Sequence, residues 1–228
     1  MRHAIYFCPN PASELHRLGS TWLGRDAFSC DSLRQPDVRL HEVTAAPRRY
    51  GLHATLKPPF RLKQNASAAA FDAAVRTLSS QHESFQAPAL ILAEIDGFLA
   101  LVPDTPCKPI DELAADCVQQ IDDFRTPPGE AELHRRRAVG LTEAQEQLLQ
   151  RWGYPFVLDE YRFHITLTES LDPEKLEWFR PLAAEYFAPV LGMPLTVDAV
   201  TVMIEPDEDD DFRVLERFPL VYNAMKAA

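Results

Sequence analysis

Leu52-His53-Ala54-Thr55-Leu56 and Phe163-His164-Ile165-Thr166-Leu167 are the two stretches that decide the fold of this chain. Each stretch reads apolar–His–apolar–Thr–apolar. In a β-strand, side chains alternate between two faces with a period of two. Each stretch therefore predicts a strand that presents a histidine and a threonine on one face and apolar side chains toward a core. None of the other five histidines has a threonine two residues later.

The two histidine–threonine pairs carry the chemistry that the pattern predicts. Imidazole has an ordinary pKa near neutrality, so one ring can accept a proton while the other donates one. The hydroxyls of Thr55 and Thr166 can donate hydrogen bonds to phosphate oxygens. If the pairs face each other, His53, His164, Thr55 and Thr166 form a catalytic set that can hydrolyse a phosphodiester without a metal.

The residues that flank the motifs add candidates for substrate binding. Strict alternation places Lys57 on the face of His53, and it places Arg162 and Thr168 on the face of His164. Lys57 and Arg162 would add positive charge beside the histidines. Tyr50 falls on the opposite face, but the chain before the first motif can be irregular, so Tyr50 and Arg49 stay candidates. The predicted substrate-binding residues are Lys57, Arg162, Thr168 and Tyr50.

Around the two motifs, the order of the predicted elements repeats. Hydrophobic periodicity and turn residues such as Asp96-Gly97 indicate a strand, a helix and a strand pair in each half. In the first half these elements are residues 51–56, 66–80, 89–93 and 98–102. In the second half they are residues 161–168, 173–186, 195–204 and 212–218. The predicted fold is α+β and bilobed, with duplicated β-α-β-β units and mostly antiparallel sheets around a central cleft.

We expect one domain over residues 1–228, with pseudo-symmetric halves at about 1–109 and 153–228. A helical connection over about 110–152 joins the halves and holds two expected helices, residues 110–124 and 141–152. Between these helices, Arg135-Arg136-Arg137 indicates a solvated helix face more than a phosphate contact.

The net charge and the hydrophobic pattern of the chain argue against two classes of partner, long nucleic acids and membranes. The net charge is −11, which opposes binding of long nucleic acids because such binding rests on a basic surface. No apolar run approaches the roughly 20 residues that span a membrane, and the start of the chain is too short in apolar residues for a signal peptide. We therefore expect a cytoplasmic protein with a small phosphorylated sugar or nucleotide as substrate, no membrane partner and an undetermined oligomeric state. The acidic run at 205–211 lacks the spacing of a calcium loop and indicates a solvated turn.

The motifs resemble those of the two-histidine (2H) phosphoesterase superfamily, which includes 2′-5′ RNA ligase-like proteins and cyclic nucleotide phosphodiesterases. Residues 49–60 and 161–168, together with Trp22-Leu23-Gly24-Arg25-Asp26, resemble a bacterial branch that tends to be encoded beside phosphonate-degradation genes. The resemblance implies a bilobed fold with the motifs on adjacent central strands, facing each other across a cleft. It also implies metal-independent phosphoester chemistry without a cofactor, with a ribosyl cyclic phosphate as the substrate.

Three alternatives remain open. Two histidines and a carboxylate from Asp159, Glu160 or Glu169 would make a metal site, although the threonines would then have no role. The chain would instead be a non-catalytic phosphate-binding module if the histidines only hold an anion. The third alternative keeps the chemistry but applies it to RNA ends, as a 2′-5′ ligase or cyclic phosphodiesterase.

Overall fold

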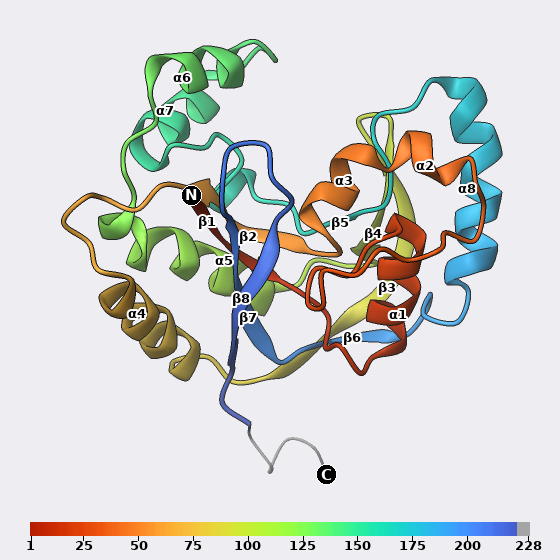
Figure 1. The fold of residues 1–228 in the computed structure, drawn as a ribbon, viewed down its shortest axis with the longest axis horizontal. Coiled ribbons are helices and arrows are strands. Elements are labelled where there is room, and N and C mark those ends of the chain that lie inside the picture. Colours follow the sequence, from red (N-terminus) through yellow and green to blue (C-terminus); the bar gives the residue numbers. More distant parts are fainter. Residues whose placement is uncertain (223–228) are drawn as a thin grey trace.

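Two four-stranded sheets form the centre of this computed structural model, which describes residues 1–222 (Figure 1). The strands are β1 (Arg2–Phe7), β2 (Ala54–Phe60), β3 (Phe85–Ile95), β4 (Phe98–Pro103), β5 (Ile165–Thr166), β6 (Pro194–Val197), β7 (Ala199–Glu205) and β8 (Arg213–Pro219). One sheet has the order β2-β1-β7-β8 and the other β5-β4-β3-β6. All neighbours within these sheets pair antiparallel, which confirms the predicted α+β class with mostly antiparallel sheets.

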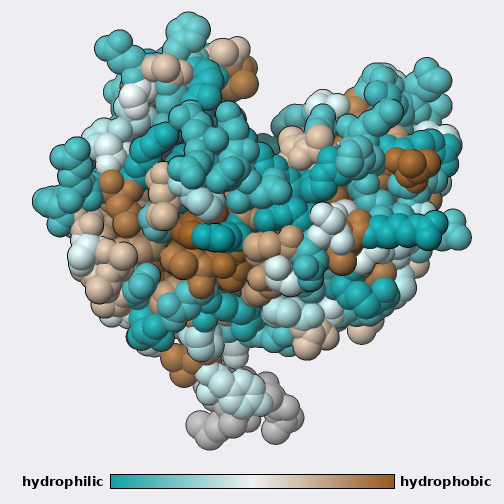
Figure 2. All heavy atoms as spheres, viewed as in Figure 1, coloured by the Kyte–Doolittle hydropathy of each residue, from teal (hydrophilic) through white to brown (hydrophobic). Residues whose placement is uncertain are grey.

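Helices cover the sheets and form the two lobes. They are α1 (Glu14–Leu23), α2 (Leu40–Val43), α3 (Ala45–Tyr50), α4 (Ala68–Ser80), α5 (Lys108–Gln120), α6 (Glu130–Arg137), α7 (Glu143–Trp152) and α8 (Pro173–Phe187). In Figure 1, α6 and α7 rise on one side and α2, α3 and α8 on the other, with β2 and β5 between them. Figure 2 shows the surface hollowed between these two lobes.

The helices predicted from periodicity are confirmed, and their side-chain caps explain where they begin. The hydroxyl of Ser67 accepts from the backbone of Ala70 at the start of α4. Asp172 caps α8, and Thr142 forms a capping box with Gln145 at the start of α7. The helix expected over residues 110–124 is shorter, because α5 ends at Gln120 and a 3-10 turn, Asp122–Phe124, follows.

Each sheet mixes strands from the two predicted halves. Strands β1 and β2 pair in one sheet with β7 and β8, while β3 and β4 pair in the other with β5 and β6. Each motif strand, β2 or β5, is the edge strand of its own sheet. The motifs are therefore on edge strands of two sheets, whereas the family resemblance implies adjacent central strands.

The prediction of one continuous strand over residues 195–204 is wrong, because the structure has two strands there. The run breaks at Asp198 into β6, which extends the sheet of β5, and β7, which lies inside the sheet of β2. The Asp198 carboxylate accepts from the Asn10 amide at 3.2 Å and pairs with Arg217. These polar contacts hold the residue at which the chain crosses from one sheet to the other.

The motif strands are also shorter than predicted. β2 begins at Ala54 and β5 covers only Ile165–Thr166, so each histidine lies just before its strand. Gly51 ends α3 with a φ of 72°, a left-handed value that favours glycine and turns the chain into β2. After β5, the Thr168 hydroxyl accepts from the backbone N–H of Leu99 at 3.0 Å, in place of a strand partner.

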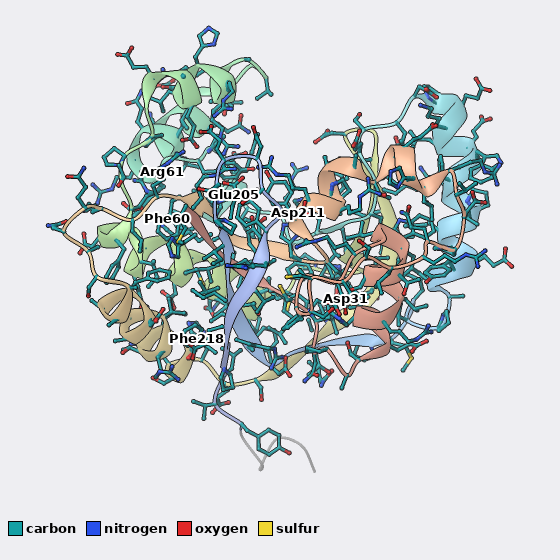
Figure 3. The ribbon with its side chains drawn as sticks, viewed as in Figure 1. Asp31, Phe60, Arg61, Glu205, Asp211 and Phe218 are labelled. Carbon is teal, nitrogen blue, oxygen red and sulfur yellow. The ribbon has the colours of Figure 1, made fainter. Side chains whose placement is uncertain are left out.

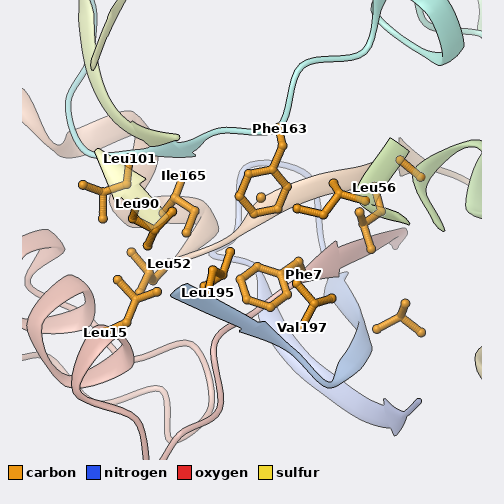
Figure 4. Close-up of a cluster of buried hydrophobic side chains, with 14 of the residues drawn as sticks. Phe7, Leu15, Leu52, Leu56, Leu90, Leu101, Phe163, Ile165, Leu195 and Val197 are labelled. Atoms are coloured by element: carbon orange, nitrogen blue, oxygen red, sulfur yellow. The ribbon is translucent and has the colours of Figure 1, made fainter. Parts of the chain in front are cut away.

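The apolar side chains of both motifs lie in one core (Figure 4). Leu52 and Leu56 from the first motif join Phe163 and Ile165 from the second, and all of them are buried. The Phe163 ring lies 5.7 Å from the ring of Phe7 on β1, which ties the two sheets together. This shared core confirms the alternation predicted for both motifs and leaves their polar side chains on the opposite side.

No helix within residues 1–222 has both the length and the apolar content that crossing a membrane requires.

Candidate active site

His53 and His164 are held by the same local contact. The Nδ1–H of His53 donates to the carbonyl oxygen of Gly51 at 2.9 Å, and the Nδ1–H of His164 donates to that of Arg162 at 2.8 Å. A carbonyl oxygen only accepts, so the proton of each neutral ring lies on Nδ1. Each Nε2 is then a free base, and among residues 1–222 neither Nε2 has a hydrogen-bond partner.

The ring of His53 is near two tyrosine rings. It stacks on Tyr6 of β1 with a centroid distance of 4.1 Å and an interplanar angle of 27°. The Tyr50 ring lies 5.8 Å from His53 and itself stacks on Phe212 at 4.9 Å. Gly51 has no space for a side chain here, because a Cβ would lie 2.5 Å from the Cβ of Ala27. Packing therefore fixes both the ring and the carbonyl that orients it.

The second motif is anchored by the Trp22 segment. The indole N–H of the fully buried Trp22 donates at 2.9 Å to the carbonyl oxygen of Leu167, the last residue of the second motif. The Phe98 ring lies 5.7 Å from the His164 ring. Residues 22–26 entered the family resemblance without a role of their own, and in the structure Trp22 links α1 to the second histidine motif.

Burial lowers the pKa of both histidines. It brings the pKa of His53 to about 4, although the Gly51 carbonyl works in the opposite direction; the charge of a protonated His164 lowers it further. Burial also lowers the pKa of His164, again opposed by its backbone hydrogen bond. Both imidazoles are neutral at pH 7 in the free protein.

A cavity of about 430 Å³ joins the two motifs, because Thr55 and His164 both line it. Thr55 lies opposite Tyr6 in the sheet, and Thr166 lies opposite Ala100. Neither threonine hydroxyl has a hydrogen-bond partner within residues 1–222. The hydroxyl of Thr55 is therefore available to a ligand in the cavity, and that of Thr166 is free beside His164.

Arg162 and Tyr50 are also near the motifs. Arg162 is exposed, lines the cavity and forms no ion pair with any residue in the described part of the chain. Tyr50 contacts His53 through its ring, as described above. Their positions fit the predicted binding roles, which remain proposals.

Lys57 lies away from the cavity, contrary to the predicted alternation. In the β1–β2 pairing, Tyr6 faces Thr55 but Ile5 faces Lys57, so Leu56 is an extra residue that forms a bulge. The bulge turns Lys57 to the other face, where its Nζ donates to the Val118 carbonyl at 3.0 Å. Lys57 also pairs with Asp122 and is buried, and burial lowers its pKa to about 8. The geometry gives Lys57 a structural contact in place of a substrate contact.

Thr168 also lies outside the cavity. Its side chain is buried, and its hydroxyl is occupied by the backbone N–H of Leu99. The strand β5 ends at Thr166, so the alternation that was extended to Thr168 no longer holds there.

The rest of the cavity wall comes from residues that sequence reasoning missed. Aromatic rings from Phe98, Tyr154, Phe156 and Tyr161 line it beside polar groups from Asp96, Gln145 and Glu160. Several of these residues follow α7, just after the helical connection. The one local signal was Tyr154-Pro155-Phe156, two aromatic residues around a proline, which indicates a loop with rings exposed to a ligand.

The carboxylates proposed for a metal site do not converge on the histidines. Glu160 accepts from the side chain of Gln145 at 2.8 Å, and Glu169 accepts from the backbone of Ala46 at 2.8 Å. Residues 1–222 hold no group of three or more histidine, cysteine, aspartate or glutamate side chains arranged to bind a metal ion.

The acidic loop between β7 and β8 is only partly the solvated turn that was predicted. Figure 3 labels its two ends, Glu205 and Asp211. Glu205 is buried and pairs with both Arg2 and Arg49, so its prediction as a solvated residue is wrong. Although burial acts to raise the pKa of Glu205, the hydrogen bond and charge of Arg2 and the charge of Arg49 lower it overall.

This loop supports the tyrosine beside His53. The backbone N–H of Phe212 donates to the Arg49 carbonyl at 2.8 Å, and the Arg25 side chain donates to the Phe212 carbonyl at 2.7 Å. Tyr50 stacks on the Phe212 ring that these bonds hold in place. Arginines and carboxylates that look unrelated in sequence therefore fix one wall around His53.

Comparison with protein families gives one match over most of the chain. A family model described as "Protein of unknown function (DUF1045)" matches residues 55–213. Two curated relatives, from Janthinobacterium sp. (strain Marseille) and Laribacter hongkongensis (strain HLHK9), are each 37% identical to this chain. Both are named ribose 1,5-bisphosphate phosphokinase PhnN. The matches cover 96% and 94% of this chain but 50% of each relative, so the chain spans about half the length of these relatives.

Solved structures that align with almost all of this chain include one described as a phosphoesterase and several of E. coli LigT. E. coli LigT complexed with 3′-AMP is 13% identical, with a TM-score of 0.47 over 96% of this chain and 98% of that one. TT0787 of Thermus thermophilus is 18% identical, with a TM-score of 0.47 and the same coverage.

Proposed function

This chain belongs to the family described as protein of unknown function DUF1045, and on that premise we propose that it hydrolyses a small cyclic phosphodiester as a metal-independent phosphoesterase. The observation that carries the proposal is the matched orientation of the two histidines. Each ring donates its Nδ1–H to a backbone carbonyl two residues earlier and leaves its Nε2 free. A structural histidine needs no such arrangement, whereas a pair of proton-transfer groups does.

The reaction divides the proton transfers between the two rings. A water oxygen attacks phosphorus while His53 Nε2 takes a proton from that water. The bond from phosphorus to the leaving ester oxygen breaks, and a protonated His164 donates its Nε2 proton to that oxygen. His53 is assigned as the base because burial lowers its pKa to about 4, a larger shift than that of His164. The bound anion favours the protonated form of His164.

Hydrogen-bond donors near the histidines would stabilise the negative charge that grows on the phosphoryl oxygens. The hydroxyl groups of Thr55 and Thr166 have no partner within the described residues, and Arg162 carries an unpaired guanidinium at the cavity. Because the motifs are held by packing and backbone bonds, these donors need little rearrangement when the charge develops.

The names of the curated relatives support a ribosyl substrate. Those relatives are named for an activity on ribose 1,5-bisphosphate, and this chain matches half of their length. The nucleotide-binding P-loop needs glycine followed by lysine, and this chain has no such pair. We therefore assign the matched half a different reaction on the same sugar. Opening a 1,2-cyclic phosphate of 5-phosphoribose by breaking the bond from phosphorus to O2 gives ribose 1,5-bisphosphate.

A nucleoside cyclic phosphate is the second candidate substrate. The aromatic wall from Phe98, Tyr154 and Phe156 favours it, because such rings can stack on a base. The cavity of about 430 Å³ falls within the usual size range for small-molecule sites. Long RNA is a poorer candidate because the net charge of the chain is −11.

Phosphorus NMR tests the proposal directly. Wild-type protein is incubated with 5-phosphoribosyl 1,2-cyclic phosphate and, separately, with a nucleoside 2′,3′-cyclic phosphate. We expect faster opening of the ribosyl compound, with the new phosphomonoester on C1 of the sugar. Faster opening of the nucleoside compound would favour the second candidate. Turnover of neither, with binding of both, would favour the non-catalytic module.

A further inference from the structure

A second, smaller cavity lies at the base of α6 and is lined by three arginines. This arginine cavity, of about 230 Å³, is lined by Arg2, Arg61 and Arg125 together with residues 126–129 and Gly153. Figure 3 shows Arg61 at the foot of the lobe that α6 and α7 form. In a chain with a net charge of −11, three arginines around one small space are a local exception.

Arg125 keeps a buried donor without a partner. Its Nε and Nη2 atoms bind the Asp122 carboxylate at 2.7 and 3.1 Å. Its Nη1 is buried and has no hydrogen-bond partner among the described residues. Nη1 lies against Gly153, where an added Cβ would be 2.7 Å away, and Gly153 lines the same cavity. A buried guanidinium nitrogen without an acceptor is costly, so an acceptor at this place would stabilise it.

The other two arginines that line the cavity also have N–H groups without an acceptor among the described residues. Arg2 uses Nε and Nη2 for the Glu205 carboxylate, which leaves Nη1. Arg61 is 52% exposed, and its nearest carboxylate, that of Glu208, is 3.7 Å away and itself 75% exposed. That distance is too long for a hydrogen bond. Arg61 is therefore the guanidinium that an incoming anion would engage most easily.

One carboxylate opposes an anion in the arginine cavity. Glu132 lines it, but its nearest cation is Arg136 on the same helix at 3.5 Å. Three arginines and one glutamate line the cavity, but Arg2 and Arg125 already pair with the carboxylates of Glu205 and Asp122. Arg61 is therefore the lining cation whose charge no carboxylate at hydrogen-bond distance neutralises among the described residues. Guanidinium groups bind phosphate oxygens through charge-assisted, often bidentate hydrogen bonds.

We propose that the arginine cavity binds a phosphate group, as inorganic phosphate or as the phosphomonoester of a phosphorylated sugar. Its volume of about 230 Å³ lies below the usual range of pockets for drug-sized ligands, which favours a small anionic group. It is separate from the cavity of about 430 Å³ that His164 lines, called the histidine cavity below. The two cavities are close along the chain, because Pro58 and Tyr154 line the histidine cavity and their chain neighbours Pro59 and Gly153 line the arginine cavity. The inference does not rest on the reaction proposed for the histidines.

Isothermal titration of the full chain with inorganic phosphate tests the site. Arg61→Gln should weaken phosphate binding by about tenfold or more, because one charge-assisted contact is lost. Glu208→Gln should have the opposite effect on phosphate affinity: it should tighten binding a few-fold at low salt, because it removes the carboxylate nearest Arg61. Arg17→Gln is the matched control, since Arg17 is 62% exposed, pairs with Glu14 and lies on α1. It should bind phosphate as the wild type does.

A second set of titrations separates this cavity from the histidines. The His164→Ala variant should still bind phosphate, and adding Arg61→Gln to it should weaken that binding. A titration with ribose 5-phosphate in place of phosphate shows whether the site prefers the free ion or a sugar phosphate. Unchanged affinity in both Arg61→Gln and Arg125→Gln would overturn the proposal. So would loss of all phosphate binding in His164→Ala, because that result assigns the anion to the histidine cavity.

Discussion

The imidazole of His53 stacks on the phenol ring of Tyr6, with centroids 4.1 Å apart and planes 27° apart. Tyr6 lies on β1 and His53 lies just before β2, 47 positions apart (53 − 6) in the chain. Tyr6 is 1% exposed, and burial raises its pKa well above the usual range, so the ring is neutral. The stack is thus a neutral packing contact that aims Nε2 of His53 without adding charge beside it.

Replacing this ring should reduce catalysis more than binding. We expect Tyr6→Leu to lower kcat on the cyclic phosphate by about tenfold, since an aromatic pair contributes roughly 0.5–1.5 kcal/mol. Tyr6→Phe keeps the ring and should keep most of kcat. Steady-state kinetics of both variants checks this. Equal kcat in the wild type and Tyr6→Leu would show that the stack does not position His53.

The histidines themselves should have the largest effects. We expect His53→Ala or His164→Ala to lower turnover by about 10²–10⁴-fold, which is roughly 3–5 kcal/mol of barrier. Thr55→Val and Thr166→Val should cost less, because each removes one neutral donor. Thermal unfolding of each variant serves as the folding control. Full activity in either folded histidine variant would contradict the assignment.

The pH dependence of kcat/KM should be bell-shaped with its maximum on the acid side of neutrality. The active free protein has a neutral His53 and a protonated His164. Burial lowers the pKa of His53 to about 4 and also lowers that of His164 below its ordinary value of 6.5. The required form is therefore most populated between these two pKa values and declines above about pH 6.5. A rate that keeps rising toward pH 9 would contradict this assignment.

Lys57 should affect stability in a pH-dependent way. Burial lowers its pKa from 10.5 to about 8, so between these values the unfolded chain binds a proton that the folded chain has lost. This group alone therefore makes the folded state more stable as pH rises from 8 to 10.5. Lys57→Met should be more stable than the wild type at pH 7, by up to roughly 3 kcal/mol, and Asp122 would still pair with Arg125.

Denaturant unfolding of both proteins at several pH values measures that difference. Buried thiols and phenols titrate in the same range, so the quantity to follow is the gap between variant and wild type. The gap should shrink as pH rises from 8 to 10. A gap that stays constant would mean that the Lys57 charge is not what destabilises the folded state.

Chelation should leave the reaction intact. The two imidazoles can carry both proton transfers, and hydroxyl and guanidinium donors can stabilise the phosphoryl charge. We expect the same kcat before and after dialysis against EDTA. If EDTA abolishes activity and one divalent metal restores it, the metal-site alternative replaces the mechanism proposed for His53 and His164.

Local pattern was enough to predict the helices and the two motifs. The side-chain alternation of LHATL and FHITL depends only on neighbouring residues, and the apolar sides of both motifs do lie in one core. Helix caps such as Thr142 and Asp172 act within one turn, so they too are visible in the sequence. The catalytic candidates followed from the same local information.

Contacts between distant segments decided the rest. The bulge at Leu56 depends on how β2 registers against β1, and it moved Lys57 to the other face. The break at Asp198 depends on the tertiary arrangement, because the residues before it pair in one sheet and the residues after it pair in the other. Burial of Glu205 depends on Arg2 and Arg49, which come from opposite ends of the first 50 residues. Strand register, sheet order and ion pairing depend on packing energies summed over the whole core. The alternation of polar and apolar residues along one segment does not contain this information, so the sequence pattern could not predict them.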